Sequence, residues 1–184
     1  MQYEIVHLEK AQWKGAVIPM RYTTQEYYDV AVSPTLQGFV IHIEKKQFET
    51  PVTHTPEEYD YPDRLYEDYR PNASAWGVVL AGELVAAIEW EPEIWSNRLR
   101  VNELWVSERF QKQGLGHALM ERAKEQAALE NRRAIILETQ SCNVNAIGFY
   151  LHEGFQIIGL DTCSYSNRDL DRKEVRIEMG YLRT

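Results

Sequence analysis

The chain has 184 residues, of which 44% are hydrophobic, and a formal net charge of −8. This length and composition suffice for one domain with a filled core. The acidic balance argues against nucleic acid as the main partner and suits a cationic small molecule. Two cysteines, Cys142 and Cys163, are too few for a disulfide framework and wrongly spaced for zinc, so no metal site is expected.

The chain shows no membrane or export signal. No apolar run reaches the length that crosses a bilayer, and the first ten residues lack the basic start and apolar middle of a signal peptide. We therefore expect a cytoplasmic protein with no membrane partner.

The first third of the chain predicts mainly strands. Residues 1–7 form a short candidate strand, and the alternating runs 27–32 and 39–48 flank the turn residues Ser33-Pro34 and Gln37-Gly38. Alternation interrupted by such residues is typical of a β-hairpin.

Residues 57–69 form an acidic segment in which tyrosines alternate with carboxylates. Thr55 can cap a helix that begins at Pro56, and Pro62 would interrupt it, so two short turns are expected. The segment contains Tyr59, Tyr61, Tyr66 and Tyr69. It is either an acidic, aromatic lid over a cationic substrate or a solvated face with half-buried tyrosines. The second interpretation is favoured, because charge runs usually face water.

From residue 75 onward the elements are more regular. Strands are expected at 76–80, 84–90, 99–106, 134–138, 155–160 and 175–179. Gly82 supplies a turn between the first two, and the apolar run 134–138 is typical of a buried strand parallel to its neighbour. A helix over 143–152 ends before Gly154, and a polar segment, 161–174, joins the last two strands.

A glycine-bearing loop, residues 111–116, joins the strand at 99–106 to a helix. The apolar face of that helix is expected to include Leu115, Ala118, Leu119, the stem of Arg122 and Ala123. A strand, a loop and a helix N-terminus form an anion pocket, because unpaired N–H groups and the helix dipole favour negative charge. Gly114 and Gly116 allow positive φ and a close backbone approach.

Two motifs together resemble a known family. Gln111-x-x-Gly114-x-Gly116, followed by Asn143-x-x-Ala146-x-x-Phe149-Tyr150-x-x-x-Gly154-Phe155, is similar to the GNAT superfamily of acetyl-CoA-dependent N-acetyltransferases. The glycine loop alone would be weak evidence for the family. Both motifs in this order, separated by one helix and one buried strand, are specific evidence. The likeness covers residues 75–179, and Leu137-Glu138-Thr139-Gln140 is similar to the streptothricin acetyltransferase branch.

The resemblance implies an α/β (α+β) fold. Its mixed, mostly antiparallel sheet has central parallel strands that splay apart, with helices on its flanks. It also implies one domain over 1–184, with acceptor-side strands and helices in 1–74 and the cofactor-binding core in 75–180.

The resemblance further implies that acetyl-CoA binds with its diphosphate on the loop amides. Its pantetheine arm would pair with the backbone near Leu104–Val106, at an open ladder edge. Lys112 either adds charge at the rim or is an ordinary surface lysine, and Asn143 either contacts the pantetheine or caps its helix, a role that Ser141 could also fill. The expected cofactor-binding residues are Leu104, Trp105, Val106, Gln111, Lys112, Gln113, Gly114, Leu115, Gly116, Thr139, Asn143, Ala146 and Phe149.

Acetyl transfer needs a general acid, and Tyr150 stands where the family places one. A phenol and a thiol have free pKa values of about 10 and about 8.5, which are close enough for proton exchange. Alternatively, Phe149-Tyr150 packs the helix onto the sheet. A backbone N–H near Trp105 or Val106 could meet the developing oxyanion.

The general base is harder to assign. Glu103 lies mid-strand, on the face of Val101 and Trp105 by period two, where burial would raise its pKa. Glu89 is the alternative base, and either carboxylate could instead bind the acceptor's cation or be an ordinary exposed glutamate. Asp161 begins a polar segment that could form a substrate wall or an interface.

Three further side chains are not expected to act. His117 falls in the first turn of the cofactor helix, and His152 lies beyond Tyr150, on the outer side. Cys142 could be a reactive nucleophile, but a plain buried thiol is favoured.

The expected function is transfer of an acetyl group from acetyl-CoA to a primary amine of a small cationic acceptor, such as a streptothricin-like antibiotic, by direct attack in a ternary complex. The alternatives are a non-catalytic acyl-CoA-binding or regulatory module, and an enzyme that acetylates a protein N-terminus or lysine. The expected partner is a small-molecule amine, and the chain is a monomer or a homodimer.

Overall fold

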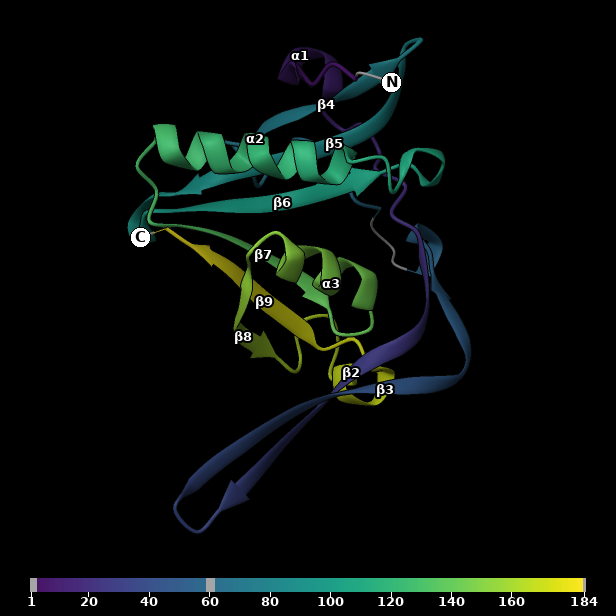
Figure 1. Ribbon diagram of the computed structural model, residues 1–184, viewed down its shortest axis with the longest axis vertical. Helices are drawn as coiled ribbons and strands as arrows, with labels where there is room; N and C mark the ends of the chain where they lie inside the picture. Colours follow the sequence, from purple (N-terminus) through teal and green to yellow (C-terminus); the bar gives the residue numbers. More distant parts are fainter. Residues whose placement is uncertain (1–2, 59–61, 184) are drawn as a thin grey trace. The chain divides into compact units, whose positions relative to one another are not determined.

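The computed structural model describes residues 3–58 and 62–183, drawn in Figure 1. The chain forms two units, which are described one at a time. The first unit comprises Met1–Met20, Thr55–Leu137 and Tyr181–Thr184, and the second comprises Arg21–His54 and Glu138–Gly180. Tyr59 and Tyr61 lie outside the described residues. The single domain expected over 1–184 stays a prediction.

The first unit is built on a sheet in which the strands follow the order β1-β4-β5-β6-β7. The strands are β1 (Val6–His7), β4 (Ser74–Leu80), β5 (Glu83–Glu93), β6 (Arg98–Val106) and the first four residues of β7 (Ala134–Gln140). The hairpin between β4 and β5 is confirmed, and its turn places Ala81 and Gly82 at positive φ, as a two-residue type I′ turn requires.

The pairing of β6 with β7 is parallel, as the apolar run predicts. It joins Arg98–Arg100 to Ala134–Ile136, and the described ladder ends there although β6 continues to Val106. The other pairs in this sheet are antiparallel. The expected mixed, mostly antiparallel sheet with a parallel pair is therefore confirmed.

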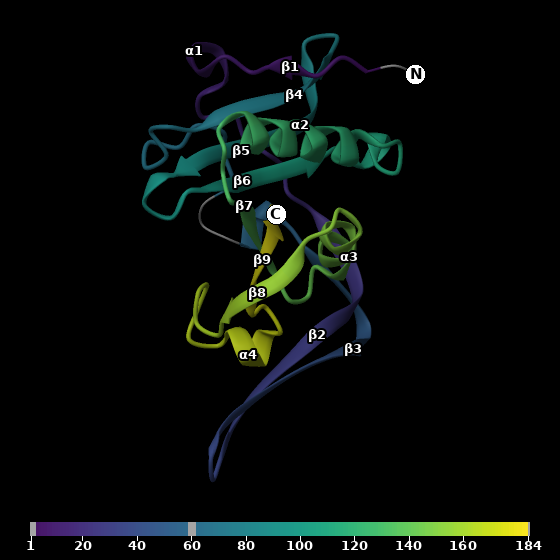
Figure 2. The same cartoon turned by 60° about the vertical axis from the view of Figure 1, so that its left-hand side comes forward.

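One helix, α2 (Leu115–Leu129), runs along one face of β4, β5 and β6, as Figures 1 and 2 show. Its buried residues are Leu115, Leu119, Met120, Ala123 and Ala127. They recur at helical spacing, and Met120 and Ala127 extend the predicted face. The stem of Arg122 was expected on that face. Its guanidinium carbon lies 4.1 Å from the ring centroid of Trp76 on β4.

The N-terminal segments of the first unit form a second apolar cluster. Its buried members are Leu8, Ile18, Leu65, Tyr66, Ala75 and Ala87, and Trp105 of β6 packs against it. Helix α1 (Lys10–Trp13) and a 3-10 turn, η1 (Pro56–Glu58), belong to the same stretches of chain. The 3-10 turns η2 (Ile94–Ser96) and η3 (Glu108–Phe110) follow β5 and β6.

The acidic segment is the favoured solvated face in its carboxylates, because Glu57, Glu58, Asp63 and Asp68 are exposed, but its tyrosines differ from the prediction. Tyr66 is only 1% exposed; its hydroxyl donates to the Leu8 carbonyl and accepts from the Ala75 N–H. Tyr69, by contrast, is 70% exposed. The prediction of half-buried tyrosines is wrong for both residues, because the chain turns inward at Leu65 and Tyr66 to cover the sheet.

The second unit contains a long ribbon of two strands, β2 (Tyr22–Thr35) and β3 (Gly38–His54). The predicted hairpin is confirmed, but the pairing extends well beyond the alternating runs, to Tyr22 opposite His54. The unit also holds the end of β7, α3 (Val144–His152), β8 (Gln156–Asp161), α4 (Asp169–Arg172) and most of β9 (Arg176–Leu182), with the strand order β7-β9-β8.

Among the described residues, no helix combines the length and apolar character needed to cross a bilayer.

Candidate active site

The glycine loop of the first unit ends in an open helix N-terminus. Gly114 is the N-cap of α2 at φ 86°, and no side chain of the described residues caps the helix there. The first helical bond runs from the N–H of Ala118 to the carbonyl of Gly114, at 3.0 Å. A β-carbon at Gly114 would meet no heavy atom of the described residues within 4 Å, so they leave the space beside it open. The amides of the first helical turn have no intrahelical acceptor and can receive an anion.

The expectation of positive φ at Gly116 is wrong. Gly116 lies inside α2 and does not take a positive φ, whereas Lys112 does, at 58°. The two residues with positive φ that turn the chain into the helix are thus Lys112 and Gly114, and not two glycines. Gly116 contributes no side chain to the first turn of α2.

The two glutamines of the loop are occupied in holding it. The Gln111 side chain donates to the Val106 carbonyl at 3.1 Å, and the Gln113 side chain donates to the Arg109 carbonyl at 2.9 Å. The Tyr3 hydroxyl donates to Gln113 Oε1 at 2.7 Å. We infer that these side chains shape the loop and leave its amides to meet a ligand. Lys112 is exposed, which fits both interpretations of this residue.

The edge of β6 offers a second kind of backbone site. Leu104, Trp105 and Val106 pair with β5 on one side, while the described ladder to β7 ends at Arg100. Among the described residues of the first unit, none forms a strand pair with the other edge of these three residues. Such an edge can pair with an extended ligand, as the expected pantetheine arm requires.

A pair of carboxylates lies on the two strands of this sheet. Glu89 of β5 and Glu103 of β6 are directly opposite each other, and their residues are 0% and 6% exposed. The pairing then shifts, because Trp90 faces Val101 and leaves Asn102 as a bulge. Directly opposed residues share a face and successive residues do not.

The bulge corrects one predicted orientation. Glu103 shares its face with Glu89 and with Trp105, which is opposite Ala87, as period two predicts. Val101, however, lies on the face of Trp90, so the prediction that it shares the face of Glu103 is wrong. The extra residue reverses the alternation, and a local pattern could not reveal it.

Arg70 joins the two carboxylates. Its Nη1 lies 2.7 Å from Glu103 Oε1 and 3.2 Å from Glu89 Oε1. The other oxygen of Glu89 accepts the Tyr66 N–H at 2.5 Å, and the Asn102 side chain approaches Glu89 Oε1 at 3.4 Å. Sequence reasoning missed Arg70. The sequence shows only that Arg70 follows the acidic segment directly, as one of two cations in residues 57–70 beside Arg64.

Burial raises the pKa of Glu103 to about 8. The charge of Asp63 acts in the same direction, and the Arg70 hydrogen bond opposes both. Burial lowers the pKa of Arg70, but the hydrogen bond from Arg70 to Glu103 outweighs it and holds the pKa of Arg70 above its ordinary value. Two buried carboxylates sharing one guanidinium retain a proton more readily than a simple ion pair. The expected rise in the pKa of Glu103 is therefore confirmed, but sequence reasoning did not identify Arg70 as its neighbour.

The remaining predicted site residues belong to the second unit. Asn143 caps α3, and its Oδ1 accepts the Ala146 N–H at 3.2 Å, while Ser141 instead donates to the Lys173 carbonyl. Tyr150 is 8% exposed, and its ring packs against Phe149 and Phe155. Tyr150 is thus a buried, packed ring, and its packing of the helix onto the sheet and its role as an acid both stay predictions.

Three other residues of this unit can be placed. Thr139 is buried on β7, and Asp161 is exposed, with its Oδ1 accepting the Cys163 N–H at 2.9 Å. Cys142 is a buried thiol, as favoured, and its sulfur lies 3.6 Å from His54 Nε2.

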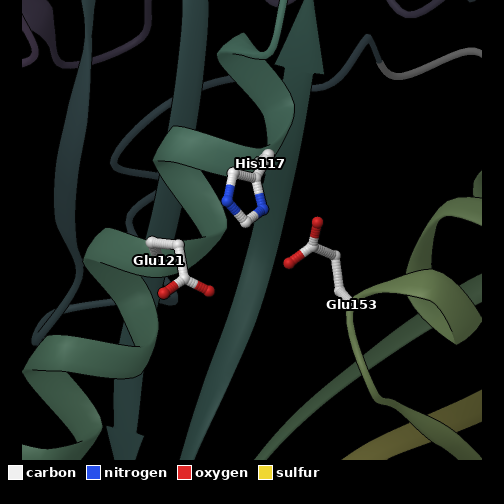
Figure 3. A group of neighbouring side chains, drawn as sticks. All are labelled: His117, Glu121 and Glu153. Atoms are coloured by element: carbon white, nitrogen blue, oxygen red, sulfur yellow. The ribbon is translucent and has the colours of Figure 1, made fainter.

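His117 and His152, which were not expected to act, are both on the surface of their own units. Figure 3 shows His117 and Glu121 one turn apart on the same side of α2, and Glu153 after the end of α3. His117 is exposed in the first turn of α2, and His152 is exposed at the end of α3.

Comparison with known proteins places the chain in a family. The acetyltransferase (GNAT) family matches residues 38–155. A streptothricin acetyltransferase of Escherichia coli is 30% identical over 131 residues, which cover 71% of this chain and 74% of that protein.

Solved structures show the same fold. A crystal structure of nourseothricin acetyltransferase has a TM-score of 0.73 at 23% identity and covers 98% of each chain. A crystal structure from Bacillus anthracis str. Ames, in complex with acetyl coenzyme A, has a TM-score of 0.73 at 22% identity, covering 100% of this chain and 99% of that one. The chain belongs to the acetyltransferase (GNAT) family and is an acetyl-CoA-dependent N-acetyltransferase, as its two motifs predict.

Proposed function

We propose that this enzyme acetylates a primary amine of a small cationic acceptor of the streptothricin type, by direct attack in a ternary complex. The observation that carries this proposal is the buried Glu103 carboxyl, whose pKa of about 8 suits a base near neutral pH. The similarity to a streptothricin acetyltransferase and the net charge of −8 support a cationic acceptor.

The first requirement of the chemistry is a neutral amine. In this proposal the ionised form of Glu103 takes the proton from the acceptor's ammonium group. Arg70 is a positioning residue, because its guanidinium holds the carboxylates of Glu103 and Glu89 side by side. Glu89 then contributes negative charge that attracts the acceptor, or serves as the base in place of Glu103.

The second requirement is a place for the cofactor. Acetyl-CoA, when bound, supplies an acyl thioester open to nucleophilic attack. The uncapped amides at the start of α2 would hold its diphosphate, and the free edge of Leu104–Val106 would pair with its pantetheine arm. A backbone N–H near Trp105 or Val106 would meet the charge that develops on the acyl oxygen.

The third requirement is a proton for the departing thiolate. We assign this to the phenol of Tyr150, in α3, because of its position in the motif. Thr139, Asn143, Ala146 and Phe149 would contact the cofactor, and Asp161 the acceptor. The packing of Tyr150 against Phe149 and Phe155 holds its ring in one orientation, which suits a directed proton donor.

The proposal is tested by measuring thiol release from acetyl-CoA with a panel of amines. The panel contains a streptothricin, an aminoglycoside, a polyamine and a peptide with free N-terminal and lysine amines. We expect the streptothricin to give the highest kcat/KM, with mass spectrometry showing one added acetyl group. Highest activity on the peptide would identify a protein acetyltransferase, and binding of acetyl-CoA without turnover on any amine would indicate a non-catalytic module. Either result would contradict the proposal.

A further inference from the structure

One face of the β2–β3 ribbon is apolar from the Val30–Ile43 pair to the turn at its tip. Three pairs of residues are directly opposite each other across the ribbon: Val30 and Ile43, Val32 and Ile41, and Pro34 and Phe39. Opposed residues share a face, and so do residues two apart. These six residues therefore form one surface, here called the apolar ribbon face. The other face carries Ala31, Ser33, Val40 and His42.

This surface is covered at its base and exposed toward its tip. Val30 is 7% exposed, but Val32 is 48%, Ile41 55% and Phe39 80% exposed, and Leu36 in the turn is fully exposed. Both views show the end of the ribbon with no other element of its unit beside it (Figures 1 and 2). Within the second unit, no described residue covers the apolar ribbon face near the tip.

An uncovered face of this kind needs an explanation. A two-stranded ribbon is at best marginally stable in water unless its apolar face packs on something. Val32, Leu36, Phe39 and Ile41 together expose on the order of 500 Å² of side chain, at the upper end of what a monomer shows. Two such faces would bury about 1,000 Å² on meeting, the least that a specific interface requires.

Charge indicates which partner fits. Between Val30 and Ile43 the chain has no Asp, Glu, Lys or Arg, although 26% of all its residues are charged. A nucleic acid or a charged peptide therefore finds nothing to pair with here. Two copies of a protein with a net charge of −8 repel each other across most of their surfaces, but not across a charge-free face.

We propose that the apolar ribbon face is a docking surface for a second copy of this chain. The two ribbons pack face to face about a two-fold axis, so that each copy supplies the apolar side chains that cover the other. A lipid bilayer is the less favoured occupant, because the apolar residues run along one face of both strands and no cationic residue lies among them.

The test compares neighbouring residues on opposite faces of the ribbon. Ile41 and Val40 are 55% and 53% exposed, but only Ile41 belongs to the apolar ribbon face. In sedimentation equilibrium of the full chain at micromolar concentration, under reducing conditions, we expect wild type and Val40→Ser to have twice the 21.5 kDa of one chain. Ile41→Ser should weaken the dimer at least tenfold, and circular dichroism should show that both variants remain folded.

A second experiment tests whether the two ribbons face each other. Ile41→Lys and Ile41→Glu should each be monomeric, because like charges would meet across the axis, and an equimolar mixture should dimerise. Val40→Lys and Val40→Glu should each remain dimeric. A monomeric wild type, equal weakening by Val40→Ser and Ile41→Ser, or no rescue in the mixture would overturn the proposal. So would a monomer that floats with phosphatidylcholine–phosphatidylglycerol vesicles, which would identify a lipid surface.

Discussion

The glycine loop and the carboxylate pair lie in the same unit but are built in different ways. The loop consists of backbone: Lys112 and Gly114 turn the chain, and amides at the start of α2 are left open. The pair consists of side chains from β5 and β6, held by Arg70 from a segment of chain that precedes both strands. A site made of backbone can be recognised from one short stretch, whereas a site made of side-chain charges depends on distant partners.

The difference also separates what each region can do. The loop offers binding, because amides at a helix N-terminus stabilise an anion without exchanging protons. The pair offers proton transfer, because the buried Glu103 has its pKa raised to about 8. Variants in the first region should therefore affect affinity for acetyl-CoA, and variants in the second should affect turnover and its pH dependence.

The largest effect is expected at the loop. Gly114→Glu places a carboxylate at the mouth of α2 and strains a residue at φ 86°. It should abolish acetyl-CoA binding in calorimetry, since the side chain would fill the loop and its negative charge would meet the diphosphate. Gly82→Glu is the matched control, because Gly82 has φ 84° and equally open surroundings in the β4–β5 turn. Unchanged affinity in Gly114→Glu would refute the assignment of the loop.

The next effect is expected at the carboxylate pair. Glu103→Gln keeps the shape of the side chain but removes the base, so kcat should fall about 10²- to 10⁴-fold while acetyl-CoA affinity stays within a factor of two. Glu83→Gln, an exposed change at the start of β5, is the control. If Glu103→Gln keeps wild-type kcat, the base moves to Glu89 or to water.

A smaller loss is expected in the second unit. Tyr150→Phe keeps the ring packed against Phe149 and Phe155 but removes the phenol, so kcat should fall about a hundredfold with little change in acetyl-CoA affinity. Tyr181→Phe, a half-buried phenol on β9, should retain wild-type turnover. Full activity of Tyr150→Phe would leave Tyr150 with its packing role alone.

The smallest effect is expected at Arg70. Its hydrogen bond and positive charge hold down the pKa of Glu103, so Arg70→Met should raise that pKa further. The pH dependence of the rate should move to higher pH, and the rate at neutral pH should fall several-fold. Arg70→Lys keeps a cation and should move the profile less. A profile that stays in place, or moves to lower pH, would remove Arg70 from its positioning role.

Most of the fold could be predicted from the sequence, because its elements are locally encoded. Alternation marked the β2–β3 hairpin, Gly82 marked the turn between β4 and β5, the apolar run 134–138 marked the parallel strand β7, and Asn143 marked the start of α3. The predicted lengths of these helices and strands were less accurate. The β2–β3 ribbon continues past its alternating core because backbone pairing does not need an apolar pattern.

The site was predicted only in part, and the errors have physical causes. The bulge at Asn102 reversed the face of Val101, the turn-forming positive φ fell on Lys112 instead of Gly116, and Tyr66 packed inward. The role of Arg70 requires a contact 33 residues away in the chain, to Glu103. No periodicity within one element carries that information.

The central claim is that Glu103 takes the proton from the acceptor. It is tested most directly by the pH dependence of kcat/KM for wild type and Glu103→Gln with the same streptothricin acceptor. Because burial raises the pKa of Glu103 to about 8, a growing share of the carboxyl is protonated, and so unable to act as a base, as the pH falls below that value. The wild-type rate should therefore rise through about pH 8 and level off above it, and Glu103→Gln should lack this rise. An identical rise in Glu103→Gln would contradict the account.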